Sequence, residues 1–298
     1  MRQILHMGRM QRQVARAVVA SVLLSVACKD EKKSTISPMT EPIHTTSKSK
    51  PSIPKPTSSS KPKPTASKAK PPKKPKKRTG CPDEMARVSY FCIDRWEVHL
   101  VGKNDGTLHP FNKSPTRKRR NLKAVSAPDV FPQGHMSQIS AKAACENAGK
   151  RLCKKDEWQK ACMGPDKTRF PHGNERDEWK CNIGKEPHIL DLFFPDIPHL
   201  KRAGKEFNHE ELLLQPGYLT KTGDHYECTN GFGVFDMDGN LSEWIDGGKE
   251  VEGIQRGWFM GDPFSGKGIS GCYRHVKLHA DNYLDYSLGT RCCKNARH

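Results

Sequence analysis

Cysteine placement is the feature that most restricts how this chain can fold. Ten of the eleven cysteines lie between Cys81 and Cys293, and no CxxC pair occurs anywhere in the 298 residues. A zinc site would need paired short spacings, whereas an even number of cysteines behind an export signal favours disulfides. At about 2–4 kcal/mol each, four or five disulfides would offset the chain entropy of long loops. The sequence therefore predicts a disulfide-linked domain in an oxidising compartment.

The N-terminus has the pattern of an export signal. Four arginines precede an apolar run from Ala17 to Ala27, which is too short to span a bilayer comfortably. The small residues in "SVAC" resemble the lipobox of bacterial lipoproteins, with Ser25 where leucine is usual. We therefore expect residues 1–28 to be a signal peptide and Cys28 to be lipidated. This places the protein in the bacterial cell envelope on a lipid anchor, with a secreted or periplasmic soluble form as the alternative.

Residues 29–80 have a composition that cannot form a core. They consist mainly of Lys, Pro, Ser and Thr, with fifteen basic and three acidic residues. Because prolines fix φ and lysines repel each other, the segment is expected to be a disordered, extended tether. A solvated spacer is the expected role, and binding of an anionic envelope polymer is the alternative. Aromatic residues are not interleaved with the lysines, so no specific nucleic-acid partner is expected.

The remaining residues, 81–298, are expected to form one domain. They carry 32 basic and 30 acidic residues, so the folded part is nearly neutral. Apolar and polar residues alternate over residues 85–100, which predicts an early pair of strands. Residues 101–127 contain the basic cluster "TRKRRNLK". We interpret this segment as an exposed loop, with an anion-binding patch as the alternative.

Two helices are predicted near the middle of the chain. "ISAKAACENAGKRL" can begin at Ser140 as N-cap and stop at Gly149, and "KDEWQKACMGP" can be capped by Asp156 and end at Gly164. After Cys181, Gly and Pro recur every few residues and no amphipathic segment is long. More than half of the domain is therefore expected to be loop and short strand.

Several motifs occur in an order that identifies a family. In sequence they are "AGKRLCKKDEWQKACMG", "RFPHGNE", "CN", "GFGVFDMDGNLSEW", "RGW", "CYR" and "GTRCC". Together they resemble the sulfatase-modifying-factor family, which includes the formylglycine-generating enzymes, over essentially all of residues 81–298. The resemblance implies an α+β, C-type-lectin-like fold that is rich in loops and stapled by disulfides.

Calcium is the structural cofactor that the resemblance implies. In the family the GNxxEW loop resembles a calcium site, and the corresponding side chains here are Asn240 and Glu243. Hard oxygen ligands on a glycine-shaped loop suit Ca²⁺. A second family site starts at an asparagine like Asn182, for which Asp196 or Asp224 could supply the carboxylate. The alternative is that Asn240 and Glu243 only satisfy loop amides.

The family's oxidase chemistry requires residues that are partly missing here. Its oxidases bind copper(I) with two cysteine thiolates five residues apart and use oxygen to convert a substrate cysteine to formylglycine. Cys272 resembles the second cysteine, but Lys267 stands at the first position, and an ammonium cannot replace a thiolate. We therefore expect a binding or scaffolding module for a peptide or glycan. The alternative is a copper-dependent formylglycine-generating oxidase with Cys272 catalytic, or another metal-dependent enzyme of the family.

The cysteine pairing is predicted in part. The resemblance implies that Cys145, on the first helix, bonds Cys292 in the "GTRCC" strand. Cys272 lacks a thiol partner for copper, so we expect it to be bridged, with Cys228 as the nearest mate. The remaining expected pairs are Cys153 with Cys293 and Cys162 with Cys181, and Cys81 and Cys92 complete the ten disulfide cysteines.

Overall fold

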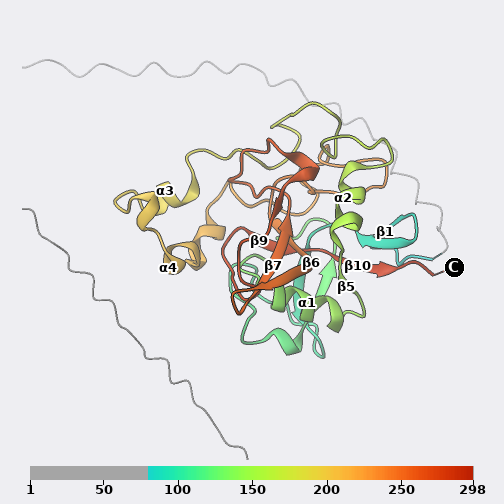
Figure 1. Cartoon of the computed structure of the whole chain (residues 1–298), viewed down its shortest axis with the longest axis horizontal. Coiled ribbons are helices and arrows are strands. Elements are labelled where there is room, and N and C mark those ends of the chain that lie inside the picture. The colour runs from blue at the N-terminus through green and yellow to red at the C-terminus, as the bar shows by residue number, and fades with distance from the viewer. Residues whose placement is uncertain (1–79, 298) are drawn as a thin grey trace, which may run out of the picture. The chain divides into compact units, whose positions relative to one another are not determined.

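A computed structural model describes residues 80–297 of the chain (Figure 1). The described residues all belong to one unit. The predicted signal peptide, the lipidation site at Cys28 and the tether up to residue 79 lie outside the described residues. Within residues 80–297, no helix is both long and apolar enough to cross a bilayer.

The first sheet joins the two ends of the described chain. Its strand order is β1 (Met85–Val88), β2 (Phe91–Asp94), β10 (Cys292–Asn295) and β5 (Arg151–Leu152). All neighbouring strands in it are antiparallel. The last strand therefore pairs with one of the first, and Figure 1 shows the C-terminus close to β1. The alternation over residues 85–100 corresponds to β1, β2 and the start of β3.

Two further sheets complete the β structure. β3 (Val98–Gly102) pairs with β4 (Leu122–Ser126) as an antiparallel ribbon. We expected residues 101–127 to be a loop. This is wrong for both ends of the segment, which lie in β3 and β4. The third sheet has the order β8 (His275–Val276), β7 (Ile254–Met260), β6 (Ser242–Val251) and β9 (Leu288–Thr290), with β6 and β9 parallel.

Both predicted helices form, with different N-caps from those expected. α1 covers Gln138–Asn147, and its cap is Ser137, whose hydroxyl accepts a hydrogen bond from the Ser140 amide at 3.2 Å. Ser140 was expected to be the cap but lies inside the first turn, because the chain is still extended at Ser137. α2 covers Lys155–Met163.

The N-cap of helix α2 is Lys154 rather than the expected Asp156. The amide of Lys154 donates to the Glu157 carboxylate at 2.9 Å, which satisfies one donor of the first turn. Asp156 is exposed in that turn and accepts no capping bond from the helix backbone. The helix ends where expected, at Gly164, whose φ of 68° favours glycine.

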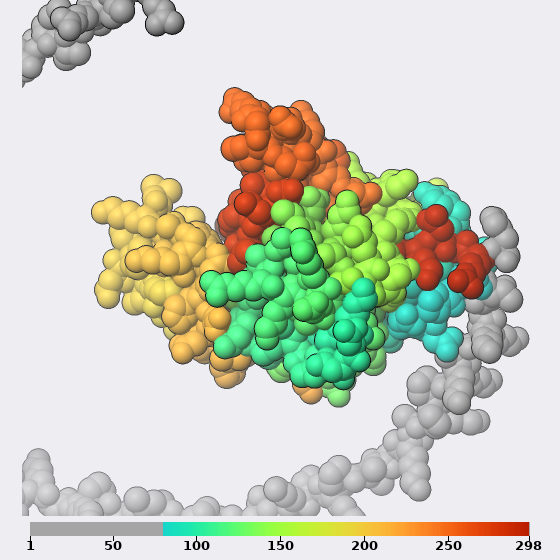
Figure 2. Space-filling model, turned by 90° about the horizontal axis from the view of Figure 1, so that it is seen from below, coloured from blue at the N-terminus to red at the C-terminus, as the bar shows by residue number. Residues whose placement is uncertain are grey.

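Residues 189–214 form a side lobe of short helices. The segment contains α3 (Ile189–Phe193), α4 (Gly204–Phe207), η2 (His199–Lys201) and η3 (Glu210–Leu214). Figures 1 and 2 show it, in yellow and orange, projecting from the sheets. Its buried apolar side chains pack with Phe264 and Tyr286 in one cluster, which attaches the lobe to the rest of the domain.

Five disulfides link the described cysteines. They are Cys81–Cys92, Cys145–Cys292, Cys153–Cys293, Cys162–Cys272 and Cys181–Cys228. The second and third pairings are the ones we expected, and they tie α1 and the start of the α2 segment to the final strand.

The expected pairs Cys162–Cys181 and Cys228–Cys272 are wrong. Cys162 lies near the end of α2, and the chain after this helix turns so that the carbonyl of Arg169 accepts a bond from the Cys272 amide at 3.0 Å. This contact brings η4 (Gly271–Tyr273) against α2, and Cys162 and Cys272 share one apolar cluster. Cys181 and Cys228 instead lie together in a separate small cluster.

Candidate functional site

The Glu243 carboxylate lies at the centre of the domain and is fully engaged by protein donors. Glu243 is on β6, and Arg291 connects β9 to β10; both are buried. Arg291 Nη2 donates to Glu243 Oε1 at 2.7 Å and Nε to Oε2 at 2.8 Å. The indole of Trp158 on α2 donates to Oε2 at 2.6 Å. These bonds connect the GNLSEW motif with the RLCKKDEW helix and the GTRCC strand.

Asn240 is held by a second set of hydrogen bonds. Its Oδ1 accepts from Asn182 Nδ2 at 2.9 Å and from the Thr220 amide at 3.1 Å, and its Nδ2 donates to Glu97. Glu97 also accepts from the Leu241 amide at 2.9 Å. Asn240 has a φ of 57°, which asparagine tolerates better than most residues. Its side chain therefore fixes the turn that leads into β6.

Three buried carboxylates, those of Glu97, Asp236 and Glu243, surround the buried guanidinium of Arg291. Burial and the neighbouring Asp236 and Glu243 raise the pKa of Glu97 well above its usual value. Burial also raises the pKa of Asp236 to about 7. One guanidinium cannot neutralise three carboxylates, so the centre favours protonated forms of Glu97 and Asp236. No sequence pattern pointed to Glu97, Asp236 or Arg291 as site residues, although Asp236 and Arg291 stand inside the GFGVFDMDGNLSEW and GTRCC motifs.

The observed bonds do not fit calcium bound by Asn240 and Glu243. A guanidinium occupies the Glu243 carboxylate, and a cation placed there would have to displace it. Of the three predicted ligands, Asn182 has an oxygen, Oδ1, that is buried without a hydrogen-bond partner. Asp196 and Asp224 are both exposed, and no bond from either to Asn182 is found among the described residues. Within residues 80–297, no group of three or more His, Cys, Asp or Glu is arranged to hold a metal.

Cys272 does not fit the two-thiolate copper site. Its sulfur is bonded to Cys162, and neither residue has exposed surface. Lys267, which stands where the first thiolate would be needed, is exposed, and its carbonyl accepts from Arg176 Nε at 3.0 Å. All ten cysteines between 81 and 293 are in disulfides, so the described part of the chain offers no thiolate.

Asp238, in the GFGVFDMDGNLSEW motif, carries a buried carboxylate without a hydrogen-bond partner among the described residues. It has no exposed surface, and neither of its oxygens has a hydrogen-bond partner within residues 80–297. Burial, reinforced by Asp262, raises the pKa of Asp238 to about 7. Asp262 itself forms an ion pair with Arg274 at 2.9 Å.

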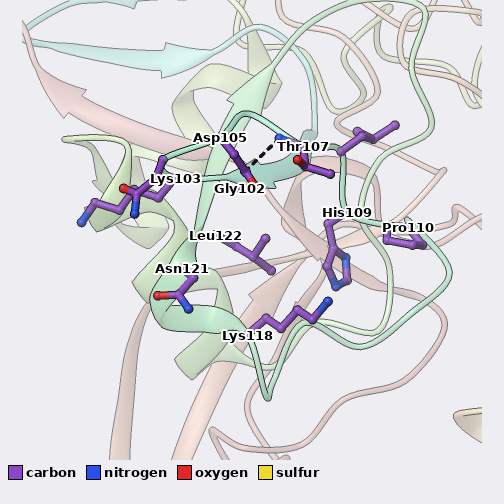
Figure 3. A pocket seen from close by; sticks show the side chains of 11 residues that line it. Gly102, Lys103, Asp105, Thr107, His109, Pro110, Lys118, Asn121 and Leu122 are labelled. Carbon is purple, nitrogen blue, oxygen red and sulfur yellow. Dashed lines mark hydrogen bonds between the residues drawn. The ribbon is translucent and has the colours of Figure 1, made fainter.

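A cavity of about 450 Å³ lies at the end of the β3–β4 ribbon where residues 103–121 connect the two strands (Figure 3). It is lined by Gly102 at the end of β3, by residues 103–105 and 107–110, and by Lys118, Asn121 and Leu122 before and at the start of β4. In Figure 3, the ends of the Lys118 and His109 side chains point toward the same part of the hollow. The basic cluster TRKRRNLK was the sequence signal for this region. The cavity itself was not predicted, because the turn after β3 determines it.

Backbone hydrogen bonds hold the wall of this cavity in place. The Gly102 amide donates to the Thr107 carbonyl at 2.7 Å, and the His109 amide donates to the Leu100 carbonyl at 2.9 Å. On the other side, the Lys103 amide donates to the Asn121 carbonyl at 2.7 Å. The wall is therefore formed before any ligand binds, which lowers the ordering cost of binding.

Comparison with known proteins matches the chain to one family and to relatives of low sequence identity. A family model described as sulfatase-modifying factor enzyme 1-like domain matches residues 66–278. A formylglycine-generating enzyme from Thermomonospora curvata is 31% identical over 117 residues, which are 38% of this chain and 32% of that enzyme. The chain thus matches about a third of the length of this relative.

Solved structures with a similar course of the chain are distant in sequence. PvdO from Pseudomonas aeruginosa is 16% identical, covers 69% of this chain and 80% of its own, and has a TM-score of 0.42. Treponema denticola variable protein 1 is 10% identical, covers 73% of this chain and 93% of its own, and has a TM-score of 0.44. CarF is 15% identical, covers 69% and 86%, and has a TM-score of 0.39.

The matched family segment spans well over half of the chain and includes every motif from "AGKRL" to "CYR". The domain has the predicted α+β, C-type-lectin-like fold, with few helices, short strands and five disulfides. The chain belongs to the family of sulfatase-modifying factor enzyme 1-like domains, of which the formylglycine-generating enzymes are members.

Proposed function

We propose that the domain is a non-catalytic binding module of the bacterial cell envelope. The observation that carries this proposal is the buried disulfide between Cys162 and Cys272. A thiolate is the form of cysteine that binds copper(I), and a sulfur that is bonded to another sulfur cannot supply it.

The location of the module follows from its disulfides and from the N-terminal sequence. Five disulfides agree with an exported protein that folds in an oxidising compartment. In the proposed arrangement, lipidated Cys28 anchors the chain to a membrane and residues 29–80 hold the domain away from it. The module then presents its loops to a peptide or a glycan.

Peptide mapping of unreduced protein tests the proposal. The chain is treated with iodoacetamide under non-reducing conditions, digested and analysed by mass spectrometry. We expect Cys272 to be recovered in a peptide linked to Cys162 and not alkylated. A sample that is first unfolded and reduced serves as the control for alkylation of the same cysteine.

An oxygen-consumption assay tests the activity directly. The chain is loaded with copper(I) and mixed with a cysteine-containing sulfatase peptide, beside an active formylglycine-generating enzyme as positive control. We expect no oxygen consumption above that of copper alone. Alkylated Cys272 together with copper-dependent oxygen consumption would overturn the binding-module proposal.

A formylglycine-generating oxidase is the second candidate, because the Thermomonospora relative is named a formylglycine-generating enzyme and the family is described by a sulfatase-modifying factor enzyme. It requires cleavage of the Cys162–Cys272 disulfide and a copper ligand other than Lys267. Reduction that is mild enough to leave the other four disulfides intact, followed by the same oxygen assay, separates this candidate from the binding module.

A further inference from the structure

Positive charge in the domain is concentrated beside the cavity at the end of the β3–β4 ribbon. Residues 102–123 contain seven basic residues and one acidic residue, whereas the rest of the domain has 25 basic and 29 acidic residues. Among the described residues, the only acidic side chain in ion-pair contact with this segment is Glu210, which contacts Lys113. Figure 2 shows the segment, in teal and green, on the surface of the domain. Such local charge attracts anions.

Lys118 brings one of these charges to the cavity without a competing partner. Its ammonium group has no hydrogen-bond or ion-pair partner within residues 80–297, and its side chain lines the cavity. Lys103, the other lysine of the lining, is already bonded to Asn147 Oδ1 at 3.1 Å. Lys118 is therefore the donor available to an anionic group in this hollow.

His109 supplies an acceptor in the same cavity. Gln133 Nε2 lies 2.9 Å from three carbonyl oxygens, those of Phe111, Lys113 and Gly134, which fixes the orientation of its amide. Gln133 Oε1 therefore accepts from His109 Nδ1 at 3.0 Å. This bond places the proton of the neutral imidazole on Nδ1 and leaves Nε2 as an acceptor.

His109 is neutral near pH 7 in this environment. Burial lowers its pKa, the bond to Gln133 opposes that change, and the charges of Lys118 and Lys113 reinforce it. A neutral Nε2 can accept a hydrogen bond from a hydroxyl group but cannot donate one to an anion. The cavity thus combines a cationic donor with a neutral acceptor.

The remaining lining contains one carboxylate, that of Asp105, whose Oδ1 accepts a hydrogen bond from the Thr107 amide at 3.1 Å. Its other groups suit a sugar ring. Asn104, Asn121 and Thr107 offer amide and hydroxyl groups, and Leu108 and Pro110 offer apolar surface at the rim. A volume of about 450 Å³ falls within the range of small-molecule sites. We propose that this cavity binds an acidic saccharide unit, with the anionic group on Lys118 and a hydroxyl on His109 Nε2. This proposal deepens the proposed binding function by naming its ligand class.

Calorimetric titration of the full chain tests the ligand class. The probes are glucuronic acid, glucose 6-phosphate, glucose and a tetraglutamate peptide, so that the carboxylate and the phosphate ester are compared on similar sugars. We expect at least one acidic sugar to bind about tenfold or more tightly than glucose, which corresponds to one charge-assisted contact. The absence of binding, or equal affinity for glucose, would overturn the proposal.

A matched pair of variants tests the site. Lys118→Gln and Arg117→Gln remove the same charge from adjacent exposed residues, but only Lys118 lines the cavity. We expect Lys118→Gln to weaken binding of the acidic sugar about tenfold and Arg117→Gln to weaken it less than twofold. Equal losses would show that the overall positive charge of the segment attracts the sugar, and would contradict a specific site at Lys118.

The peptide probe separates the two ligand classes of the proposed function. If tetraglutamate binds more tightly than either acidic sugar and depends on Lys118, the cavity is a peptide site and the saccharide proposal fails. Failure of all probes would leave the Cys162–Cys272 result unchanged, since the thiol measurement does not depend on the cavity. Conversely, a free Cys272 would overturn the non-catalytic function without altering the measured sugar affinities.

Discussion

Arg291 and Glu243 form an ion pair at the centre of the domain, with Nη2 and Oε1 2.7 Å apart and almost no exposed surface on either side chain. The guanidinium also donates to the carbonyls of Asp94 and Phe235, at 3.2 and 2.8 Å. A single side chain thus connects β6, β2, the glycine-rich motif and the final strand. Removing one partner of such a pair leaves a buried charge, which is far more costly than removing both.

The first prediction concerns the role of Glu243. Glu243→Gln should lower the free energy of unfolding by about 3–5 kcal/mol, because Arg291 would lose its carboxylate partner. Urea denaturation should give the same loss in calcium and in a chelator, since the guanidinium and not a metal engages this carboxylate. The double variant Glu243→Gln, Arg291→Met serves as control and should lose less than the sum of the two single changes.

A calcium role for Glu243 would give a different pattern. Chelation would then destabilise the wild-type chain and leave Glu243→Gln unaffected. That result would show that Glu243 binds calcium and would contradict the ion-pair assignment.

The second prediction concerns the start of α1. Ser137→Ala should lower the free energy of unfolding by about 1 kcal/mol, because the Ser140 amide would lose its capping acceptor. Equilibrium unfolding monitored by circular dichroism measures this change. A larger loss for Ser140→Ala than for Ser137→Ala would show that Ser140, and not Ser137, is the N-cap of α1.

Local sequence patterns predicted which helices form, but they predicted less well where each helix begins and which distant residues it contacts. The apolar faces of both helices and the stop at Gly164 follow from neighbouring residues, and all of them are observed. The two caps were missed for different reasons. At α1, both Ser137 and Ser140 have a hydroxyl that could accept the amide, and the cap is Ser137 because the chain is still extended there. At α2, the Lys154 amide donates to the Glu157 carboxylate, so no acceptor side chain at the cap position marks it.

Contacts between distant residues were predictable only where the family motif encodes them. Cys145–Cys292 joins the helix before the AGKRL motif to the GTRCC motif, and the resemblance implied it. Cys162–Cys272 depends on the loop at Arg169, whose course no local pattern gives. The same holds for Glu97, which meets Asn240 across more than 140 residues of sequence. The cavity at Lys118 likewise depends on a turn that follows β3.

The third prediction concerns Asp238 and pH. Its pKa is raised to about 7 in the folded protein, mainly by burial, from an ordinary value of 3.8. Below about pH 4 the carboxyl is protonated in both states. Between pH 4 and 7 only the unfolded chain loses the proton, so the wild-type protein loses stability, and the full cost persists above pH 7.

Asp238→Asn should therefore stabilise the protein at pH 8 and change little at pH 4. Each pKa unit corresponds to about 1.4 kcal/mol, which limits the gain to about 4 kcal/mol. Thermal unfolding at both pH values measures the effect, with Asp224→Asn as the control at an exposed position. Destabilisation of Asp238→Asn at pH 8 would mean that a cation or a nearby arginine binds the ionised carboxylate.

The last prediction compares two disulfides of very different span. Cys145–Cys292 encloses 147 residues, whereas Cys81–Cys92 encloses 11. In the chain-entropy description, removing the first costs about 5 kcal/mol and removing the second about 3 kcal/mol, because the longer loop restricts the unfolded chain more.

The double variants Cys145→Ala, Cys292→Ala and Cys81→Ala, Cys92→Ala avoid a leftover thiol that could exchange with other disulfides. Both cysteine pairs are largely removed from solvent, but only the first connects α1 to β10, the strand that also pairs with β2 and β5. Urea denaturation should therefore show a loss about 2 kcal/mol larger for the long-range pair. Equal losses would mean that packing around Cys292, and not the restriction of the unfolded chain, determines what this disulfide contributes.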